Sequence, residues 1–344
     1  MKNVLASASR PYGASGFRAR VTRSAAPIGA ARTSPKDFLS VLDFDADQLD
    51  EALRLAGRLK QERRLGRRAS TSTALSALHV ALLFEKPSLR TRATFEIAVR
   101  ELGGDVIAPE RDVALGSREA ATDVARNLER WVAAVVIRTF HQERLQAFAT
   151  AAPKLHVINA LTDQEHPCQA MADILTLQEA WGALAGRALT YVGDGNNVAT
   201  SLVHAAMLTG MHVRVSSPPG FELPPHVVSD AARISRLGAT LSLVGDPKEA
   251  VAGTNAVYTD VWTSMGQESE EATRRAAFLP YQVNADLMSR AADDAVFMHC
   301  LPAHRGDEVT DEVMDSASSV VFDQAENRLH MQKALLLMLV GNPR

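Results

Sequence analysis

The chain has 344 residues, enough for about two domains, and its 46% hydrophobic content can fill ordinary cores. A net charge of -3 and an isoelectric point near 6.4 argue against a nucleic-acid partner, and no apolar run reaches the ~18 residues that a membrane span needs. Its two cysteines, Cys168 and Cys300, do not suggest a disulfide framework, so a reducing cytosol or organelle matrix fits better than secretion.

Residues 1–35 differ from the rest of the chain. They hold six basic residues among many Ala and Ser, and neither Asp nor Glu. This composition resembles an organellar transit peptide, and the alternatives are a disordered bacterial extension or a start codon assigned too far upstream. Because the remaining sequence is bacterial in character, we expect a disordered extension on a cytoplasmic protein, and an organellar matrix only if these residues are a transit peptide.

Short β-rich runs alternate with amphipathic helical patterns after Pro35. The predicted strands cover 77–84, 105–109, 133–138, 155–159, 188–193, 212–216, 239–244, 256–261, 295–300 and 318–322. The predicted helices include 119–131, 141–151, 168–182, 197–209, 225–237 and 325–340. This alternation predicts the α/β class, with central parallel sheets flanked by helices. Composition marks no linker, so we place the domain boundary near 160–168.

The most informative segment reads Phe84-Glu85-Lys86-Pro87-Ser88-Leu89-Arg90-Thr91-Arg92 and follows an apolar run. Pro87 ends that strand because proline has no N–H to give to a sheet. A helical pattern begins near Thr91, so hydroxyl and guanidinium groups gather at a helix N-terminus, where unpaired N–H groups and the helix dipole favour an anion. Arginine adds donors that match phosphate oxygens. The segment predicts a phosphate-type site, against the alternative of an ordinary charged loop.

Ligands of open parallel sheets bind beyond the carboxyl ends of the strands, so the residues there are the next candidates. Arg138 ends the run 133–137 and, beside the cluster at Arg90, predicts a second contact to a phosphate or a carbonyl group. The segment His166-Pro167-Cys168-Gln169 opens a helix with groups suited to gripping a carbonyl or an amide, or simply to capping the helix.

The segment Gly193-Asp194-Gly195-Asn196-Asn197 follows the strand predicted at 188–193. Two glycines fit a dinucleotide-binding pattern, but Val198 stands where the third small residue belongs. The next strand ends without an acid to hold a ribose. We therefore prefer a small polar ligand, contacted by Asn197, to a dinucleotide.

Two further strand ends carry reactive groups. Asp260 could hold an ammonium group, with the loop Ser264-Met265-Gly266 closing over it, or serve as a helix cap. The segment His299-Cys300-Leu301-Pro302 places a thiol at the mouth of the same sheet, where a nucleophilic cysteine is conceivable although no base is assigned to it. The histidines and cysteines of these motifs match no zinc spacing, so we expect no metal site.

Together the motifs resemble those of the aspartate/ornithine carbamoyltransferase family, over about residues 36–342. The matching segments, in the family's order, are Ser88-Leu89-Arg90-Thr91-Arg92, His166-Pro167-Cys168-Gln169, Asp194-Gly195-Asn196-Asn197, Asp260 with Ser264-Met265-Gly266, His299-Cys300-Leu301-Pro302, and Ala325-Glu326-Asn327-Arg328. Each segment alone is moderately specific, and the ordered set is highly specific.

The resemblance implies two doubly wound domains and a symmetric assembly. Residues 36–165 would bind carbamoyl phosphate, residues 166–324 would bind L-ornithine, and residues 325–344 would form a C-terminal helix that returns to the first domain. Members of the family form trimers with the active site near the subunit interface, so we expect a homotrimer or a higher assembly of trimers.

The resemblance also implies roles for single residues. Carbamoyl phosphate would be held by Ser88, Leu89, Arg90, Thr91, Arg138 and Arg328, with His166, Pro167, Cys168 and Gln169 at its carbamoyl end. Ornithine would be held by Asn197, Asp260, Ser264 and Met265, with Cys300 and Leu301 lining the point where the two substrates meet. The catalytic residues would be Arg90, Arg138, His166, Gln169 and Cys300.

The reaction implied is transfer of the carbamoyl group to the δ-amine of L-ornithine, giving L-citrulline and phosphate without a metal or cofactor. Aspartate, N-acylornithine and putrescine are alternative acceptors. Asp260 would repel the second carboxylate of aspartate, N-acylornithine has no free α-amine for Asp260 to hold, and putrescine has neither an α-amine nor an α-carboxylate. A nicotinamide-dependent dehydrogenase and a catalytically silent relative are the alternatives outside the class. Whether the role is arginine biosynthesis or citrulline breakdown stays open.

One departure from the family's pattern concerns a contact from a neighbouring subunit. The family commonly has a glutamine just before the Leu-Gly of the segment at 114–119, and this chain has Ala114. Arg118 could substitute for it. Leu89 replaces the more frequent threonine of the carbamoyl-phosphate loop. The change is tolerated if only the backbone at this position contacts the ligand.

Overall fold

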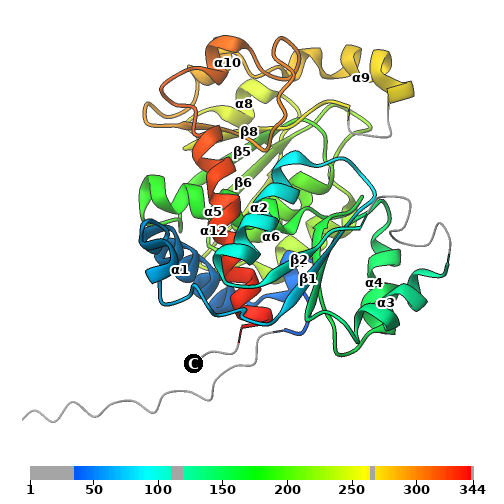
Figure 1. The fold of residues 1–344 in the computed structure, drawn as a ribbon. Helices are drawn as coiled ribbons and strands as arrows, with labels where there is room; N and C mark the ends of the chain where they lie inside the picture. The colour runs from blue at the N-terminus through cyan, green and yellow to red at the C-terminus, as the bar shows by residue number, and fades with distance from the viewer. Residues whose placement is uncertain (1–34, 110–118, 264–267, 342–344) are drawn as a thin grey trace, which may run out of the picture. The chain divides into compact units, whose positions relative to one another are not determined.

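The computed structural model describes residues 35–109, 119–263 and 268–341 (Figure 1). Its first domain contains a parallel sheet of four strands in the order β2-β1-β3-β4. The strands are β1 (His79–Phe84), β2 (Asp105–Ile107), β3 (Ala134–Arg138) and β4 (His156–Leu161). The helices α2 (Leu89–Glu101), α3 (Ala121–Leu128) and α4 (Gln142–Ala151) lie between them in the chain.

The second domain contains a parallel sheet of five strands in the order β7-β6-β5-β8-β9. The strands are β5 (Ala188–Val192), β6 (His212–Ser216), β7 (Leu241–Leu243), β8 (Ala256–Thr259) and β9 (Val296–His299). Its helices include α6 (Asn197–Leu208), α7 (Pro225–Ile234), α8 (Pro247–Val251), α9 (Glu271–Phe278), α10 (Ala285–Met288) and α11 (Asp311–Met314).

Both faces of the first sheet are buried, which explains why its strands read as continuous apolar runs. Along β1, Val80 and Leu82 belong to the core that includes α2, whereas Ala81 and Leu83 belong to the core that includes α3 and α4. Successive residues of a strand point to opposite faces, so helices must cover both sides of the sheet. The doubly wound α/β fold expected from the sequence is confirmed.

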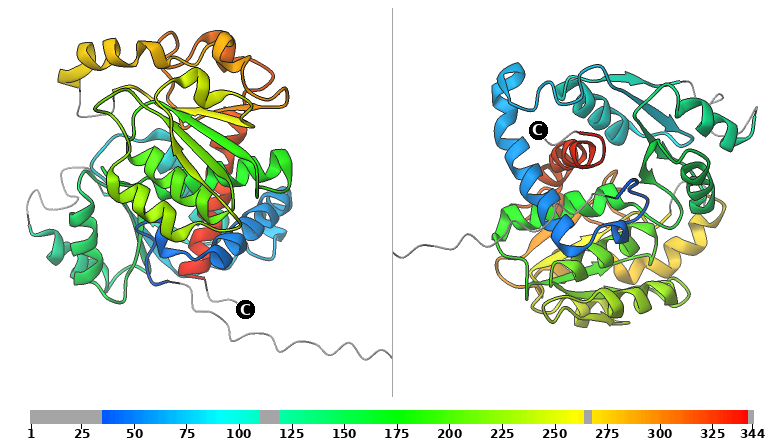
Figure 2. Two further views of the ribbon diagram at one scale, coloured as in Figure 1. Left: turned by 180° about the vertical axis from the view of Figure 1, so that it is seen from behind. Right: turned by 90° about the horizontal axis from the view of Figure 1, so that it is seen from below.

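The C-terminal helix α12 (Val321–Leu339) packs against α1 (Ala46–Glu62), α2 and α5 (Pro167–Trp181), the helix that connects the two sheets. In the right-hand view of Figure 2 the red α12 is seen nearly end-on with the blue α1 beside it. Lys333 donates to Oε2 of Glu101 on α2 over 3.0 Å, and Asn327 donates to Oε2 of Glu179 on α5 over 2.7 Å. The expected return of the last helix to the first domain is confirmed.

One predicted strand is wrong. The segment 318–322 is not a strand: Ser319 makes only an isolated bridge to Phe297, and Val321 is the first residue of α12. The apolar run that suggested a strand is too short to reveal a helical period, and Val321 is buried because it starts the helix on a core face. The pattern analysis also named no helix over α1. Among the described helices, none is long and apolar enough to span a membrane.

Candidate active site

The site lies where the winding of each sheet reverses. In the first sheet the chain winds from β1 to β2 on one side and to β3 on the other, and Phe84 pairs with Arg138 at the end of this switch. In the second sheet β5 separates β6 from β8 in the same way. Open α/β sheets bind ligands at such reversals because neighbouring loops diverge there. A cavity of about 620 Å³ is lined by residues that follow β1, β3, β5 and β8, the strands beside these two reversals.

Three guanidinium groups converge on this cavity, from Arg90 at the start of α2, Arg138 at the end of β3 and Arg328 on α12. Arg138 and Arg328 are only 7% and 3% exposed, and the Nε atom of each has no hydrogen-bond partner among the described residues. Burial, together with Arg328 and Arg90, lowers the pKa of Arg138 to about 10. Neighbouring cations that depress one another's pKa stabilise a bound anion.

Arg328 is held from two sides. Its Nη2 donates to Oγ1 of Thr91 on α2 over 2.5 Å, and its Nη1 donates to Oε1 of Gln169 on α5 over 2.5 Å. Thr91 and Gln169 are each 1% exposed, so both bonds are shielded from water. A planar guanidinium fixed by two short bonds keeps its remaining donors in defined directions.

The turn before α2 also faces the cavity. Ser88 has an extended backbone at the N-cap of α2, and its side chain makes no capping hydrogen bond. Leu89 follows it with 81% of its surface exposed, although it lines the cavity. Lys86 sits 4.3 Å from the ring centroid of Phe140 at the same wall. The unpaired N–H groups of the first helical turn therefore open toward the cavity beside Arg90.

His166 is a buried, neutral imidazole at the start of α5. It is 5% exposed, and burial, with Arg328 and Arg138 nearby, lowers its pKa well below the usual value. Its backbone N–H donates to Oγ of Ser201 over 2.8 Å, and its Nδ1 has no hydrogen-bond partner among the described residues. A neutral imidazole can donate one ring N–H to a ligand oxygen without carrying charge.

The remaining residues of the motif at 166–169 lie behind the cavity wall. Pro167 is the first residue of α5, and the thiol of Cys168 donates to the carbonyl oxygen of Asn159 over 3.2 Å. Burial raises the pKa of Cys168 to about 12, so this thiol is protonated. Gln169 reaches the site through its bond to Arg328.

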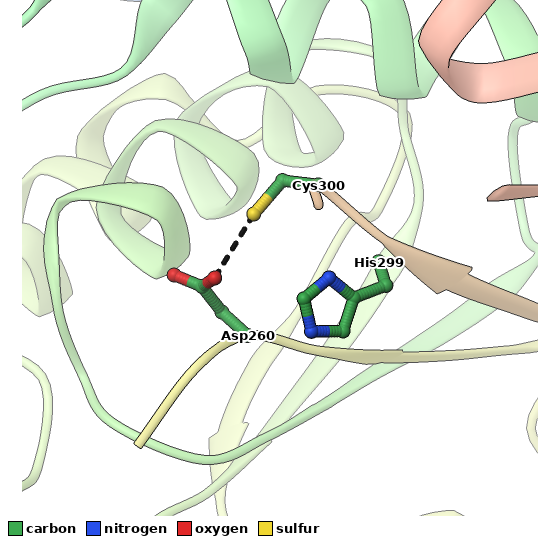
Figure 3. Close-up of side chains that lie close together, drawn as sticks. All are labelled: Asp260, His299 and Cys300. Atoms are coloured by element: carbon green, nitrogen blue, oxygen red, sulfur yellow. Dashed lines mark hydrogen bonds between the residues drawn. The ribbon is translucent and has the colours of Figure 1, made fainter. Parts of the chain in front are cut away.

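On the opposite wall Asp260 and Cys300 form a hydrogen-bonded pair (Figure 3). The Cys300 thiol donates to Oδ1 of Asp260 over 2.9 Å, and Nδ2 of Asn196 donates to Oδ2 over 3.0 Å. Burial and the Asp260 carboxylate raise the pKa of Cys300 well above its usual value. The geometry gives no support to the conceivable nucleophilic role of this cysteine, because the thiol donates to a carboxylate that disfavours its ionisation.

Asn196 is a site residue that the sequence reasoning missed. Its Oδ1 accepts from the N–H groups of Val198 and Ala199, which caps α6, while its amide group orients Asp260. Asn197, the predicted ligand contact, lines the cavity and donates to the carbonyl oxygen of Thr162 over 2.5 Å. The two consecutive asparagines were visible in the sequence, but their spacing does not show which one caps α6 and which one contacts a ligand.

His299 lies beside this pair without being available to a metal ion (Figure 3). Asp260, His299 and Cys300 offer ligand atoms within 4.8 Å of one another, the one such group that the described residues bring together. However, Nε2 of His299 lies 3.1 Å from Oε1 of Glu308, and its Nδ1 accepts from the N–H of Leu301 over 2.9 Å. With both ring nitrogens engaged and the thiol protonated, this arrangement is poorly suited to zinc.

Several expected contacts lie outside the described residues. They are Ser264 and Met265 of the ornithine loop, Ala114 at the position of the usual glutamine, and Arg118 as its replacement. Leu301 lines the cavity with a backbone φ of 58°, in the left-handed region.

Comparison with known proteins gives the chain a family. The model for the carbamoyl-phosphate-binding domain of aspartate/ornithine carbamoyltransferases matches residues 36–179, and the model for the Asp/Orn-binding domain matches residues 185–339. Ornithine carbamoyltransferase of Anoxybacillus flavithermus is 47% identical over 307 residues, which is 89% of this chain and 96% of that protein.

Solved structures agree with the sequence comparison. Ornithine carbamoyltransferase from Thermus thermophilus is 44% identical, with a TM-score of 0.80 over 90% of this chain and 100% of that one. The enzyme from Pyrococcus furiosus is 42% identical, with a TM-score of 0.84 over 90% of this chain and 99% of that one. The chain therefore belongs to the aspartate/ornithine carbamoyltransferase family.

Proposed function

We propose that this protein is an ornithine carbamoyltransferase, which transfers the carbamoyl group of carbamoyl phosphate to the δ-amine of L-ornithine and releases L-citrulline and phosphate. The observation that carries the proposal is a single cavity with three guanidinium groups on one wall and a carboxylate paired with a thiol on the other. One wall suits a phosphate, and the other suits an amine. The 47% identity to an ornithine carbamoyltransferase over nearly the full length supports the same substrates.

Carbamoyl phosphate would occupy the wall formed by α2, β3 and α12. Its phosphate would accept hydrogen bonds from the first turn of α2, from Ser88 and Thr91, and from Arg90. Arg138 and Arg328 would lie at the bridge between phosphate and carbamoyl group. His166 would hold the carbamoyl end as a neutral donor to the carbonyl oxygen, and Gln169 would act there through Arg328.

L-Ornithine would occupy the wall formed by the ends of β5, β8 and β9. Asp260 would accept from the α-ammonium group, because each carboxylate oxygen can accept a further hydrogen bond besides those from Cys300 and Asn196. Asn197 would contact the α-carboxylate, and Ser264 and Met265 would complete this subsite. Cys300 and Leu301 would then lie beside the δ-amine.

The reaction forms a bond from the δ-nitrogen to the carbonyl carbon and breaks the bond from that carbon to the bridging phosphate oxygen. The electron pair leaves with phosphate, and the amine gives up one proton before attack and one after it. A free δ-ammonium group has a pKa near ~10.4. Three nearby guanidinium groups disfavour a further positive charge, so the site itself promotes loss of the first proton. Catalysis would otherwise consist of positioning and electrostatic stabilisation.

An acceptor panel tests the proposal. Purified protein is supplied with carbamoyl phosphate and, separately, with ornithine, N-acetylornithine, putrescine or aspartate, and the ureido product is measured. We expect citrulline from ornithine at a rate at least about 100-fold above that with the other acceptors. A site built for an α-ammonium group rejects N-acetylornithine and putrescine, which lack it, and Asp260 would repel the second carboxylate of aspartate. A preference for another acceptor, or nicotinamide binding without transfer, would replace the proposal.

We further propose a cytoplasmic homotrimer, the assembly that the family resemblance implies, which serves arginine biosynthesis or citrulline breakdown. Light scattering after gel filtration should give three times the 37.1 kDa mass of the chain or a multiple of that value. A mass of a single chain at working concentrations would contradict the trimer.

A further inference from the structure

We propose that Asp173 is a positioning residue of the carbamoyl-phosphate subsite: its carboxylate sets the orientation of the amide groups of Gln169 and Gln324, and through them holds Arg328 and the backbone at His299. The inference rests on the proposed function. Asp173 lies outside the cavity wall and none of the sequence motifs included it.

Asp173 is fully buried on α5, one turn after Gln169. Its Oδ1 accepts from Nε2 of Gln169 over 2.8 Å and from Nε2 of Gln324 over 2.7 Å. Its Oδ2 has no hydrogen-bond partner among the described residues. Two amides from different helices therefore meet on one carboxylate oxygen in the interior.

A carboxylate only accepts hydrogen bonds, so each amide must turn its NH₂ group toward Asp173 and its oxygen away. The oxygen of Gln169 then accepts from Nη1 of Arg328 over 2.5 Å. The oxygen of Gln324 accepts from the N–H of His299 over 3.0 Å. Reversing either amide would place its NH₂ group against another donor and leave both unpaired, which is unfavourable in a buried site.

The orientation of the two amides affects both walls of the cavity. Arg328 bridges Thr91 and Gln169, and the backbone at His299 precedes Cys300, the partner of Asp260. One carboxylate that orients two amides can therefore align the phosphate-binding guanidinium with the segment that carries the thiol. A buried polar network in which each amide is paired fixes one geometry more firmly than isolated contacts do.

Protonation of Asp173 should weaken this control, because a carboxylic acid also donates. Burial raises the pKa of Asp173 to about 7, while Gln169, Gln324 and the Tyr258 hydroxyl oppose this rise as hydrogen-bond donors. The ionisable groups that face it are Arg328 from α12, Tyr258 from β8 and Cys300 after β9. Below pH 7 the protonated form of Asp173 predominates, and this acid can pair with either orientation of the Gln169 and Gln324 amides.

The test compares Asp173→Ala and Asp173→Asn with a matched control, Thr176→Ala. Thr176 lies one turn further along α5, is 3% exposed, and accepts from Asn327 on α12, so its loss also removes a buried polar contact between the same two helices. Steady-state citrulline formation is measured for each variant with carbamoyl phosphate and ornithine varied separately.

We expect Asp173→Ala to lower kcat by about 100-fold and to raise KM for carbamoyl phosphate more than KM for ornithine. Gln169 contacts Arg328 directly, whereas the ornithine wall is reached only through the backbone N–H of His299. Asp173→Asn keeps an acceptor oxygen and should recover about tenfold of that loss. Thr176→Ala should change stability but neither kinetic constant. Equal kinetics in Asp173→Ala and Thr176→Ala would overturn the inference, whereas absence of citrulline from the wild-type protein would overturn the proposed function instead.

A second measurement tests the proposal even if Asp173→Ala does not fold. The ratio of wild-type to Asp173→Asn kcat is recorded from pH 5.5 to 9, which cancels the titration of the ornithine amine. The ratio should be highest above pH 7 and should fall toward one below it. A ratio that stays constant across this range would contradict the orienting role of the carboxylate.

Discussion

Arg90, Arg138 and Arg328 define the chemistry at the scale of single residues. They come from positions 48 and 190 residues apart in the chain, yet all three line one cavity. The sequence predicted Arg90 and Arg138 as neighbours because parallel strands end at the same edge, and the pairing of Phe84 with Arg138 bears this out. Arg328 could be placed only through the family resemblance, since no local pattern links a helix at the C-terminus to that edge.

The roles of some other site residues could not be predicted from the sequence, for a physical reason. Asp173 and Gln324 are 151 residues apart, and their contact depends on how α12 packs on α5. Asn196 caps α6 with its side-chain oxygen, while its amide group orients Asp260. A side chain's partners across helices follow from packing, which spacing along one element does not specify.

Replacing Arg90 should remove most of the turnover while the fold survives. We expect Arg90→Ala to lower kcat/KM for carbamoyl phosphate by about 10³-fold, because a charged donor aimed at the phosphate is lost. The matched control is Arg92→Ala, two residues along α2, where the guanidinium forms a half-exposed pair with Glu96. Near-normal turnover in Arg90→Ala would contradict the assignment of Arg90 to the phosphate site.

The Cys300 thiol should be slow to react with alkylating agents. The raised pKa predicts that the rate of modification by iodoacetamide still increases at pH 9, where an ordinary cysteine of pKa about 8.5 approaches its plateau. Asp260→Asn removes the neighbouring charge and should shift the profile to lower pH. The rates follow from mass spectrometry of the peptide that contains Cys300. A plateau by pH 8 in the wild-type protein would contradict a neutral thiol donor.

At the scale of elements, the strands were predictable and the ends of some helices were not. The parallel strands appear as apolar runs because both faces are covered, and residues 77–84 and 133–138 match β1 and β3 within two residues. The same criterion failed at 318–322, where Val320 is the N-cap of α12 and Val321 and Phe322 begin the helix. A short apolar run satisfies a strand and a buried helical turn equally well.

The ion pair between α12 and α2 should contribute stability that depends on pH. Burial alone would raise the pKa of Glu101, but hydrogen bonds and charges from Lys333 and Arg63 lower it below its usual value. The stabilisation is therefore present above the unfolded pKa and lost as pH falls through the folded pKa. Lys333→Met should lower the free energy of unfolding by about 1 kcal/mol at pH 7.

Urea unfolding at pH 7 and near pH 3.5 measures this effect. The difference between wild type and Lys333→Met should shrink on acidification, because Glu101 becomes protonated in both proteins. Arg100→Met is the control: its pair with Glu96 on the same helix is largely exposed and should change stability by less than about 0.5 kcal/mol. A difference that grows on acidification would contradict the sign of the Glu101 shift.

At the scale of the whole molecule, two sheets of the same winding place their reversals on one cavity. The first sheet supplies groups that suit an anion, and the second supplies groups that suit an amine, so neither domain contains a complete site. The α12 helix adds Arg328 while packing on α1, α2 and α5, which makes the C-terminus part of the site rather than an appendage. Direct transfer between two substrates requires such a shared cavity, because the reacting atoms must meet without water between them.

The most direct test of a shared cavity is the binding of one molecule that spans both walls. A bisubstrate compound, with a phosphonate joined through an acetyl group to the δ-nitrogen of ornithine, is titrated by calorimetry against wild type, Arg90→Ala and Asp260→Asn. We predict that it binds wild type at least about 100-fold more tightly than the phosphonate fragment alone, and that each substitution removes at least about tenfold of that affinity. Affinity no higher than that of the phosphonate fragment, or affinity unchanged by Asp260→Asn, would contradict a single site built from both sheets.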